Sequence, residues 1–350
     1  TLSGAYNSAF HAPTGGIAYS YSRLLPTFTL RFSRNYARRS GFQRYVYDIP
    51  PTTPDGADVP YQQSGYDERI TTVRAEIDVP VVRHPVHRAS ATVSYNYTHF
   101  ANVGSDPPVD PNAPPSSFPE LGAWGQVGLA LAYDSRRGVR HAHGDYGAET
   151  GRYARVSVNI IDPHLGGRFS DVWVGGTYIE MLRMPWRGHQ VLALALSGGA
   201  SAGTLGRRAP YYLGGTGQQA DIIRNFLLRN DYTDVGALRG FQPNAFPGRY
   251  YGVLNAEYRI PLADVERGLG TLPGFLRRVA LAPFLDLGAA WGMNGERLTR
   301  QALKWGLGTS FISSFKIGYG APIDLVLQYA RGLGDEYALH YFRAAVARSF

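Results

Sequence analysis

Apolar and polar residues alternate one by one through long stretches of this chain, and no other pattern constrains its fold as strongly. In the stretch 92–98 three apolar residues interleave with four polar ones: Val93, Tyr95 and Tyr97 with Thr92, Ser94, Asn96 and Thr98. The same alternation runs through 71–82, 253–262, 303–311 and 323–329. Because successive side chains of a strand point to opposite faces, each stretch predicts a strand with one apolar and one polar face. Helical periodicity is essentially missing, so we expect an all-β protein.

Two all-β architectures have strands of this kind. A soluble sandwich buries the apolar face against a second sheet, whereas a membrane barrel turns it towards lipid around a polar lumen. Here the polar faces carry small or charged residues throughout, and Tyr, Trp and Phe recur on the apolar faces and near strand ends, as in the aromatic girdles of membrane barrels. Many stretches are also longer than the roughly 5–6 residues typical of soluble sheets. The sequence therefore favours a transmembrane antiparallel β-barrel. A transmembrane helix is not expected, because the chain contains no run of about 18 apolar residues.

The connections between the predicted strands alternate in length. We predict fourteen strands, near residues 1–10, 14–24, 27–39, 67–82, 87–101, 122–137, 145–162, 169–186, 189–203, 250–262, 279–292, 302–316, 318–332 and 338–350. Short joints fall at 25–26, 83–87 and 185–188. Long connections rich in Pro, Gly and Asp lie between them, at 40–66, 102–121 and 204–249. Because transmembrane barrels have short periplasmic turns and long outer loops, we expect the long connections outside the cell and the last strand running towards the periplasm.

Acidic and basic residues are also divided between the long outer loops and the short inner joints. The formal net charge is +8 and comes almost entirely from arginine. The outer loops are acidic through Asp48, Asp55, Asp58, Asp106, Asp110 and Glu120. The inner joints are basic through Arg83, Arg88, Arg136, Arg137, Arg140, Arg183, Arg187, Arg277 and Arg278. A basic inner rim would meet anionic lipid headgroups or an acidic periplasmic partner, although the solubility of turns explains the same residues. Because the basic and aromatic residues alternate within strands, they indicate lumen walls and girdles, and we expect no nucleic acid partner.

Motifs in the second half of the chain resemble those of a known family. Tyr211–Gly215 are followed by Leu238-Arg239-Gly240-Phe241 in the loop 204–249, and then by Phe284-Leu285-Asp286-Leu287-Gly288. In this order and spacing they resemble the C-terminal barrel of the Omp85 superfamily, also called the bacterial surface antigen family. Its long sixth outer loop bears V/L-R-G-F/Y, followed two strands later by F-x-D-x-G. Asp134-Ser135-Arg136 with the later Gly144 resembles a D-x-R…G element of the same family, and the whole resemblance covers about residues 120–350.

The resemblance implies a sixteen-stranded barrel with the long loop folded into its lumen, where Arg239 contacts Asp286. The alternation within 279–291 agrees, because it points Asp286 and the motif residues Phe284 and Gly288 inward. A lumenal carboxylate favours a cation, and a bidentate arginine is the strongest partner available. Glu257 also points inward and is the rival partner, while an Asp286 solvated in a wide lumen remains the alternative. Since we count fourteen strands, two more are expected before Thr1. The POTRA repeats typical of the family are also missing, so either an upstream region precedes this sequence or the chain is a divergent member with another periplasmic module.

The end of the chain resembles the C-terminal recognition signal of outer-membrane barrels. Phe350 is the last residue, and Phe342 and Val346 lie on the same face of the predicted strand. Arg348 departs from the apolar residue usual at its position.

The functions implied by the resemblance are insertion and assembly of other proteins in the bacterial outer membrane, or their translocation across it. We expect one barrel domain over 1–350, in contact with outer-membrane lipid and lipopolysaccharide, with client proteins and periplasmic domains or subunits as further partners. Enzyme activity, cofactors and metals are not expected. A passive channel or a structural surface barrel, in which the loop merely plugs the pore, is the alternative.

Three further patterns have some features of a functional site. Gly199–Gly203 match G-x-S-x-G around Ser201 and would make the chain a barrel-anchored lipid hydrolase, but a nucleophile elbow needs a strand–turn–helix, and this match falls at a strand end. His141 and His143 form a pair without the further ligands of a metal site. Gly214–Gly217 lack the Lys-Ser/Thr of a phosphate-binding loop. Cysteine is absent, which excludes disulfides and thiolate metal sites.

Overall fold

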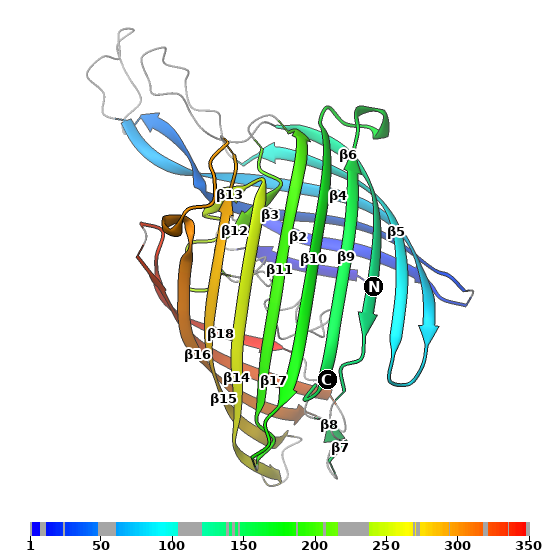
Figure 1. The fold of residues 1–350 in the computed structure, drawn as a ribbon, viewed down its shortest axis with the longest axis vertical. Helices are drawn as coiled ribbons and strands as arrows, with labels where there is room; N and C mark the ends of the chain where they lie inside the picture. Colours follow the sequence, from blue (N-terminus) through cyan, green and yellow to red (C-terminus); the bar gives the residue numbers. More distant parts are fainter. Residues whose placement is uncertain are drawn as a thin grey trace.

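Each strand of the main sheet pairs antiparallel with the next one along the chain (Figure 1). The computed structural model describes residues 2–7, 12–23, 25–47, 61–103, 121–137, 140–141, 144–145, 148–186, 188–205, 208–215, 238–268, 270, 274–293, 295–317, 321–334 and 336–347. The sheet consists of β1 (Leu2–Asn7), β2 (Ala12–Tyr21), β3 (Thr27–Tyr47), β4 (Tyr61–Arg83), β5 (Arg88–Asn102), β6 (Gly122–Asp134), β9 (Gly151–Ile161), β10 (Ser170–Arg183), β11 (Val191–Thr204), β14 (Tyr250–Gly268), β15 (Gly274–Trp291), β16 (Lys304–Ile317), β17 (Ala321–Leu333) and β18 (His340–Ala347).

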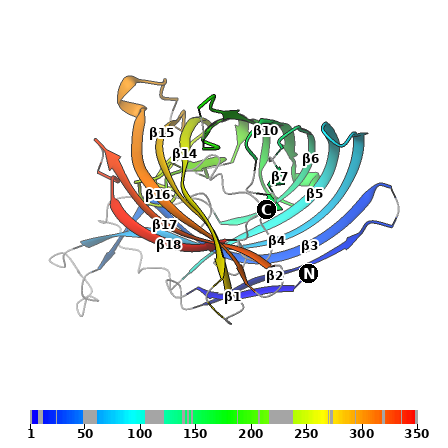
Figure 2. The ribbon, with the colours of Figure 1, turned by 90° about the horizontal axis from the view of Figure 1, so that it is seen from below.

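The sheet has fourteen strands, which are the fourteen that the sequence predicts. It curls so that β4 and β15 lie on opposite sides of a common interior (Figure 2). In the part of the chain that the structure describes, β1 and β18 form no ladder with each other, so each presents an unpaired edge. The described residues do not form all of the sixteen strands that the family resemblance implies. The two further strands expected before Thr1 would lie outside the sequence.

The sheet exposes its apolar face and buries its polar face, which is the reverse of the arrangement in a soluble protein. In β5 the apolar side chain of Val93 is 48% exposed, whereas its polar neighbours Thr92 and Ser94 are 5% and 8% exposed. The outward face of other strands is likewise apolar, with exposed Leu129, Ile160, Val174, Leu196, Leu254 and Leu327. A sandwich would bury these side chains, so the sandwich alternative is wrong, and the all-β barrel with a polar interior is confirmed. Among the described residues no helix is long and apolar enough to cross a membrane.

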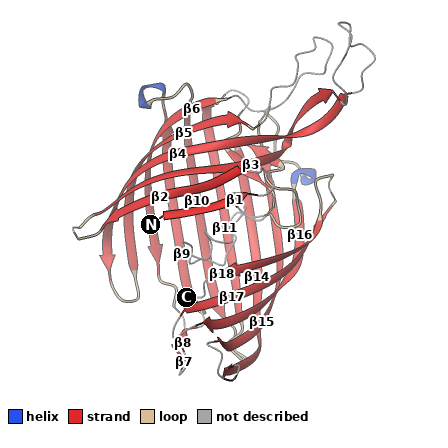
Figure 3. Cartoon of the chain, turned by 180° about the vertical axis from the view of Figure 1, so that it is seen from behind, coloured by secondary structure: helices blue, strands red, loops and turns tan. Residues whose placement is uncertain are grey.

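Long and short connections lie at opposite ends of the sheet, as the sequence predicts. Residues 84–87 join β4 to β5 at one end, while the connection from β11 to β14 lies at the other. Figure 3 shows the short 3-10 helices η1 (Pro163–Leu165) and η2 (Arg300–Ala302) at the end of the long connections. Two further pairs of short strands lie in connections, β7 (Arg140–His141) with β8 (Gly144–Asp145) and β12 (Tyr211–Leu213) with β13 (Phe246–Gly248).

Two predicted boundaries need correction. Strands β3 and β4 reach Tyr47 and Tyr61, so part of the loop expected at 40–66 is strand. Arg277 and Arg278 lie within β15 and are buried, although the charge pattern assigned them to an inner joint. Here β14 and β15 continue past their expected ends through register shifts, which interrupt the regular alternation that marks a strand in the sequence. The acidic loop residues from Asp48 to Asp58 and from Asp106 to Glu120 lie outside the described residues.

Candidate functional site in the lumen

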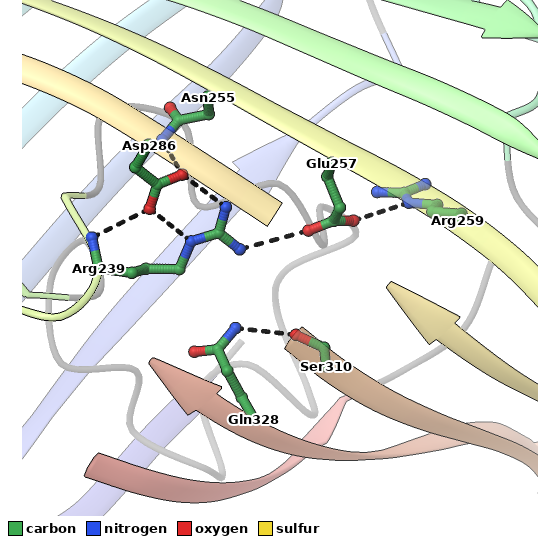
Figure 4. Close-up of polar contacts among 7 residues, drawn as sticks. All are labelled: Arg239, Asn255, Glu257, Arg259, Asp286, Ser310 and Gln328. Carbon is green, nitrogen blue, oxygen red and sulfur yellow. Dashed lines mark hydrogen bonds and ion pairs between the residues drawn. The ribbon is translucent and has the colours of Figure 1, made fainter. Parts of the chain in front are cut away.

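Arg239 of the long loop and Asp286 of β15 form a bidentate ion pair (Figure 4). Arg239 Nε donates to Asp286 Oδ2 and Nη2 donates to Oδ1, both at 2.7 Å. The backbone N–H of Arg239 also donates to Oδ2, at 3.0 Å. Asp286 is completely buried and Arg239 is 4% exposed, so the alternative of a solvated Asp286 does not hold. This paired geometry is the strongest that a carboxylate and a guanidinium form.

The ion pair sits inside a larger polar cluster. Asn255 Nδ2 donates to Asp286 Oδ1 at 2.8 Å. Glu257, predicted as the rival of Asp286, is a second partner, because its Oε2 accepts from Arg239 Nη1 at 3.3 Å while its Oε1 accepts from Arg259 Nε at 2.8 Å. Two arginines thus face two carboxylates, which compensates the buried charge. Sequence reasoning missed Asn255 and Arg259, although both lie two residues from Glu257 on the same polar face of β14.

The three defining residues of the F-x-D-x-G motif, Phe284, Asp286 and Gly288, all contact the loop motif. The ring of Phe284 lies under the guanidinium of Arg239, 3.5 Å from Cζ to the ring centroid, a cation–π arrangement. Asp286 holds the ion pair. Gly288 leaves room for Leu238, since a Cβ there would lie 3.4 Å from Leu238 Cδ1 and 3.1 Å from a methyl group of Val253. The spacing of the strand motif therefore matches the contacts that the loop makes with it.

The backbone of the loop motif lies directly on β16 and β17. A Cβ at Gly306 of β16 would lie 2.0 Å from the carbonyl oxygen of Arg239, and one at Gly332 of β17 would lie 2.2 Å from that of Gly240. Gly240 itself has a φ of +87°, and its carbonyl oxygen accepts from the N–H of Leu339 at 2.8 Å. The contact depends on glycine at all three positions, because any side chain would separate the loop from the wall.

We expect the substitution Gly240→Ala to loosen the loop from the wall. The added Cβ would lie 2.3 Å from the backbone of Arg331 and Gly332, and the positive φ is strained for alanine. The expected loss is about 2–3 kcal/mol in the free energy of unfolding, measured by urea denaturation in micelles. The matched control is Gly252→Ala in β14, where a Cβ meets nothing within 4 Å. Equal stability of the two variants would contradict this close contact.

Apolar and aromatic contacts hold the rest of the loop motif. Leu238 and Phe241 are both buried. The Phe241 ring packs edge-on against Phe246 of β13, with 5.4 Å between centroids, and Phe246 packs in turn against Tyr337. The N–H of Leu238 donates to the carbonyl of Gly215 at 3.1 Å. The motif thus joins the small β12–β13 sheet to the barrel wall.

The beginning of the loop is held through Tyr211. Its hydroxyl lies 3.0 Å from the carbonyl oxygen of Val174 and 3.1 Å from that of Ala200. Burial, followed by the neighbouring Tyr251 and Asp171, raises the pKa of Tyr211. The phenol therefore stays a neutral hydrogen-bond donor.

Ser201 has the surroundings of a structural hydroxyl. It lies within β11 and is buried, and its Oγ donates to Asp171 Oδ2 at 2.5 Å. The same carboxylate oxygen accepts from Trp173 Nε1 at 2.8 Å. A nucleophile elbow would place the serine on a strand-to-helix turn, so the position of Ser201 gives the hydrolase alternative no support.

The remaining predicted residues do not form a site together. Arg136 Nε and Nη2 donate to Asp134, at 3.1 and 3.0 Å, so the D-x-R element forms its own ion pair. Phe342 is 85% exposed on the outward face. The backbone of Val346 lies in β18, while its side chain and Phe350 lie outside the described residues. His143, Thr216 and Gly217 also lie outside them, and within the described part of the chain no three His, Asp or Glu side chains gather as a metal would require.

A polar hollow lies on the inner face of β4, β5, β6 and β9. Its volume is about 200 Å³. The polar side chains lining it are those of Arg74, Thr92, Ser94, Asn96, Gln126, Arg155, Ser157 and Asn159. These groups suit contact with water, as the inside of a membrane barrel requires.

The chain was compared with known families and structures. No protein-family model matches it, and no curated protein matches it either. It is similar to the crystal structure of BamA from Haemophilus ducreyi lacking POTRA domains 1-3, with a TM-score of 0.55 and 11% identity over 95% of this chain and 62% of that one. It is also similar to CdiB from Escherichia coli, with a TM-score of 0.56 and 10% identity over 96% of this chain and 53% of that one.

These similarities define the class of fold. Both relatives are barrels of the Omp85 superfamily, and this chain spans less than two thirds of the length of either. At such low identity the likeness concerns the fold. The chain therefore has the β-barrel fold of these two structures.

Proposed function

We propose that this chain is the barrel of an Omp85-type protein that acts in the insertion and assembly, or the translocation, of proteins at the bacterial outer membrane. The observation that carries the proposal is the buried contact of Arg239 with Asp286, made by a loop motif and a strand motif of that family. The pair holds the loop motif at a defined place on β15, as the family resemblance implies.

A mechanism for this function is implied by the family resemblance. In the family that the chain resembles, the seam between the first and last strands opens sideways and templates the strands of client proteins. An exposed edge offers a row of free N–H and C=O groups to an incoming strand.

Partners follow from the surfaces of the barrel. The exposed apolar face is suited to outer-membrane lipid and lipopolysaccharide, and the strand edges are suited to client proteins. Periplasmic domains or subunits would meet the end that carries the short turns. We propose no enzymatic activity, cofactor or nucleic acid partner for this barrel.

Reconstitution in liposomes tests the function. A client outer-membrane barrel, added unfolded, should fold faster into liposomes that contain this protein than into empty ones. Its folded fraction is read over time by its altered mobility on unheated gels. Ion conductance through the protein without any acceleration of client folding would contradict the proposal.

Ion conductance without faster client folding is the result expected of a passive channel. One observation favours this alternative. The polar hollow beside Arg74 and Arg155 lies on the inner wall, where it would suit the passage of water and ions. A channel function predicts conductance that the substitution Arg155→Glu shifts in ion selectivity, with no effect on client folding.

Any esterase activity of the purified barrel should be unchanged by Ser201→Ala. The Ser201 hydroxyl is a donor to Asp171 within a strand, and we expect hydrolysis of a short-chain ester at the level of the buffer alone for both proteins. The matched control is Ser197→Ala on the same strand, where a second serine is also buried. Activity that disappears only in Ser201→Ala would establish the hydrolase instead.

A further inference from the structure

A second arginine of the long loop is buried against the opposite wall of the barrel. Arg208 lies just after β11, and its Nη1 donates to Glu68 Oε2 of β4 at 2.9 Å. The side chains of Arg208 and Glu68 are 1% and 0% exposed. The guanidinium also stacks on Phe100 of β5, with 3.7 Å between Cζ and the ring centroid. A buried pair of this kind resists separation, because removing either partner takes an opposite charge away from a side chain that is shielded from water.

This contact repeats the chemistry of the Arg239 site with different residues. In both, a guanidinium from the loop lies between a fully buried wall carboxylate and a phenylalanine ring, Phe100 for Arg208 and Phe284 for Arg239. Arg208 also rests beside an apolar cluster made by Phe100, Trp124, Ile161, Phe169 and Leu205. The loop is therefore attached near its beginning and near its end by contacts of the same type.

The two attachments lie far apart on the sheet. Glu68 belongs to β4 and Asp286 to β15, and the strands β5, β6, β9, β10, β11 and β14 separate them in the sheet order. Figure 2 places β4 and β15 on opposite sides of the interior. A loop held at both places joins the two walls, so neither attachment alone determines the position of the whole loop.

We propose that Arg208 and Glu68 form a second anchor of the long loop, independent of the Arg239–Asp286 pair, so that the loop leaves the barrel interior only when both anchors are broken. Arg208 is then a positioning residue for the function proposed above, on which this inference rests. A client or partner that displaced the loop would have to disrupt two buried ion pairs on two walls.

The absence of cysteine from the sequence gives a direct test. Single reporters are introduced as Ala209→Cys, next to Arg208, and Ala245→Cys, in the part of the loop that follows Arg239, where the native side chains are 1% and 2% exposed. The purified full chain in micelles is treated with a bulky maleimide, and labelling rates are compared. Breaking the Arg208–Glu68 pair with Glu68→Gln should speed labelling of Ala209→Cys by about tenfold or more, and of Ala245→Cys by less than about threefold.

Breaking the Arg239–Asp286 pair with Asp286→Asn should give the reverse pattern, and the two changes together should expose both reporters. Glu76→Gln on β4, whose carboxylate pairs with Arg74, is the matched control and should expose neither. If Glu68→Gln does not fold, Arg208→Lys takes its place, since lysine retains the charge but loses the stacked planar group.

The proposal is overturned if Glu68→Gln and Arg208→Lys leave Ala209→Cys protected, or if Asp286→Asn alone exposes both reporters. The labelling rate reports the position of the loop whether or not the barrel accelerates client folding. Failure of the second anchor is therefore distinguishable from failure of the assembly function.

Discussion

Replacing Asp286 with alanine is expected to lower the free energy of unfolding by about 3 kcal/mol or more. The substitution leaves the buried guanidinium of Arg239 with Glu257 at 3.3 Å as its carboxylate partner, and it removes the acceptor of Asn255 Nδ2. Arg239→Ala should lower the free energy of unfolding by a similar amount, because the fully buried Asp286 carboxylate then lacks its arginine partner. Urea unfolding of the barrel in micelles measures both values.

The double variant shows whether Arg239 and Asp286 stabilise the barrel through a direct interaction or through independent contacts. Once one partner is gone, removing the other relieves an uncompensated charge, so the double variant should be less damaged than the sum of the singles by about 1–3 kcal/mol. Glu76→Ala, which breaks the half-buried pair with Arg74, is the control and should cost less than about 1 kcal/mol. Strictly additive effects of Arg239→Ala and Asp286→Ala would exclude a direct pairing energy.

A charge placed on the outer face of the barrel should also be costly. Leu129 lies near the middle of β6, and its side chain is 51% exposed on the apolar face. An arginine at the bilayer midplane of a membrane barrel costs about 2–4 kcal/mol. We therefore expect Leu129→Arg to lower the free energy of unfolding from lipid vesicles by that amount.

The control for the outer face is an arginine on the inner face. Ser157 of β9 lines the polar hollow, so the charge of Ser157→Arg stays in contact with water and should cost less than about 1 kcal/mol. If the two substitutions cost the same, or if the inner one costs more, the apolar face does not meet lipid.

Much of this fold was readable from the sequence because a barrel strand follows a simple rule. The alternation in 92–98 or 323–329 fixes both the strand and its two faces, and β5 and β17 place those residues as expected. The rule fails at bulges. Around Arg277 and Arg278 the register shifts, the alternation lapses, and the two residues read as part of a turn.

The site residues could be predicted from the sequence only where they belong to a recognised motif. Leu238–Phe241 and Phe284–Gly288 carry a recognisable spacing, and the structure brings Arg239 to Asp286. The contact of Arg208 with Glu68 joins residues 140 positions apart in sequence, and neither belongs to a motif. Only the three-dimensional arrangement of the loop and β4 reveals such a pair.

The most direct test of the assembly function is the rate at which a client barrel folds into liposomes that contain this protein or its Asp286→Asn variant. The wild type and the Glu76→Gln control are expected to accelerate client folding to the same extent. Asp286→Asn, folded and inserted to the same level, should lose most of that acceleration, because its loop is no longer held by a charged pair on β15. Equal acceleration by Asp286→Asn and the wild type would contradict a role for the Arg239–Asp286 pair in assembly, and no acceleration by the wild type would contradict the assembly function itself.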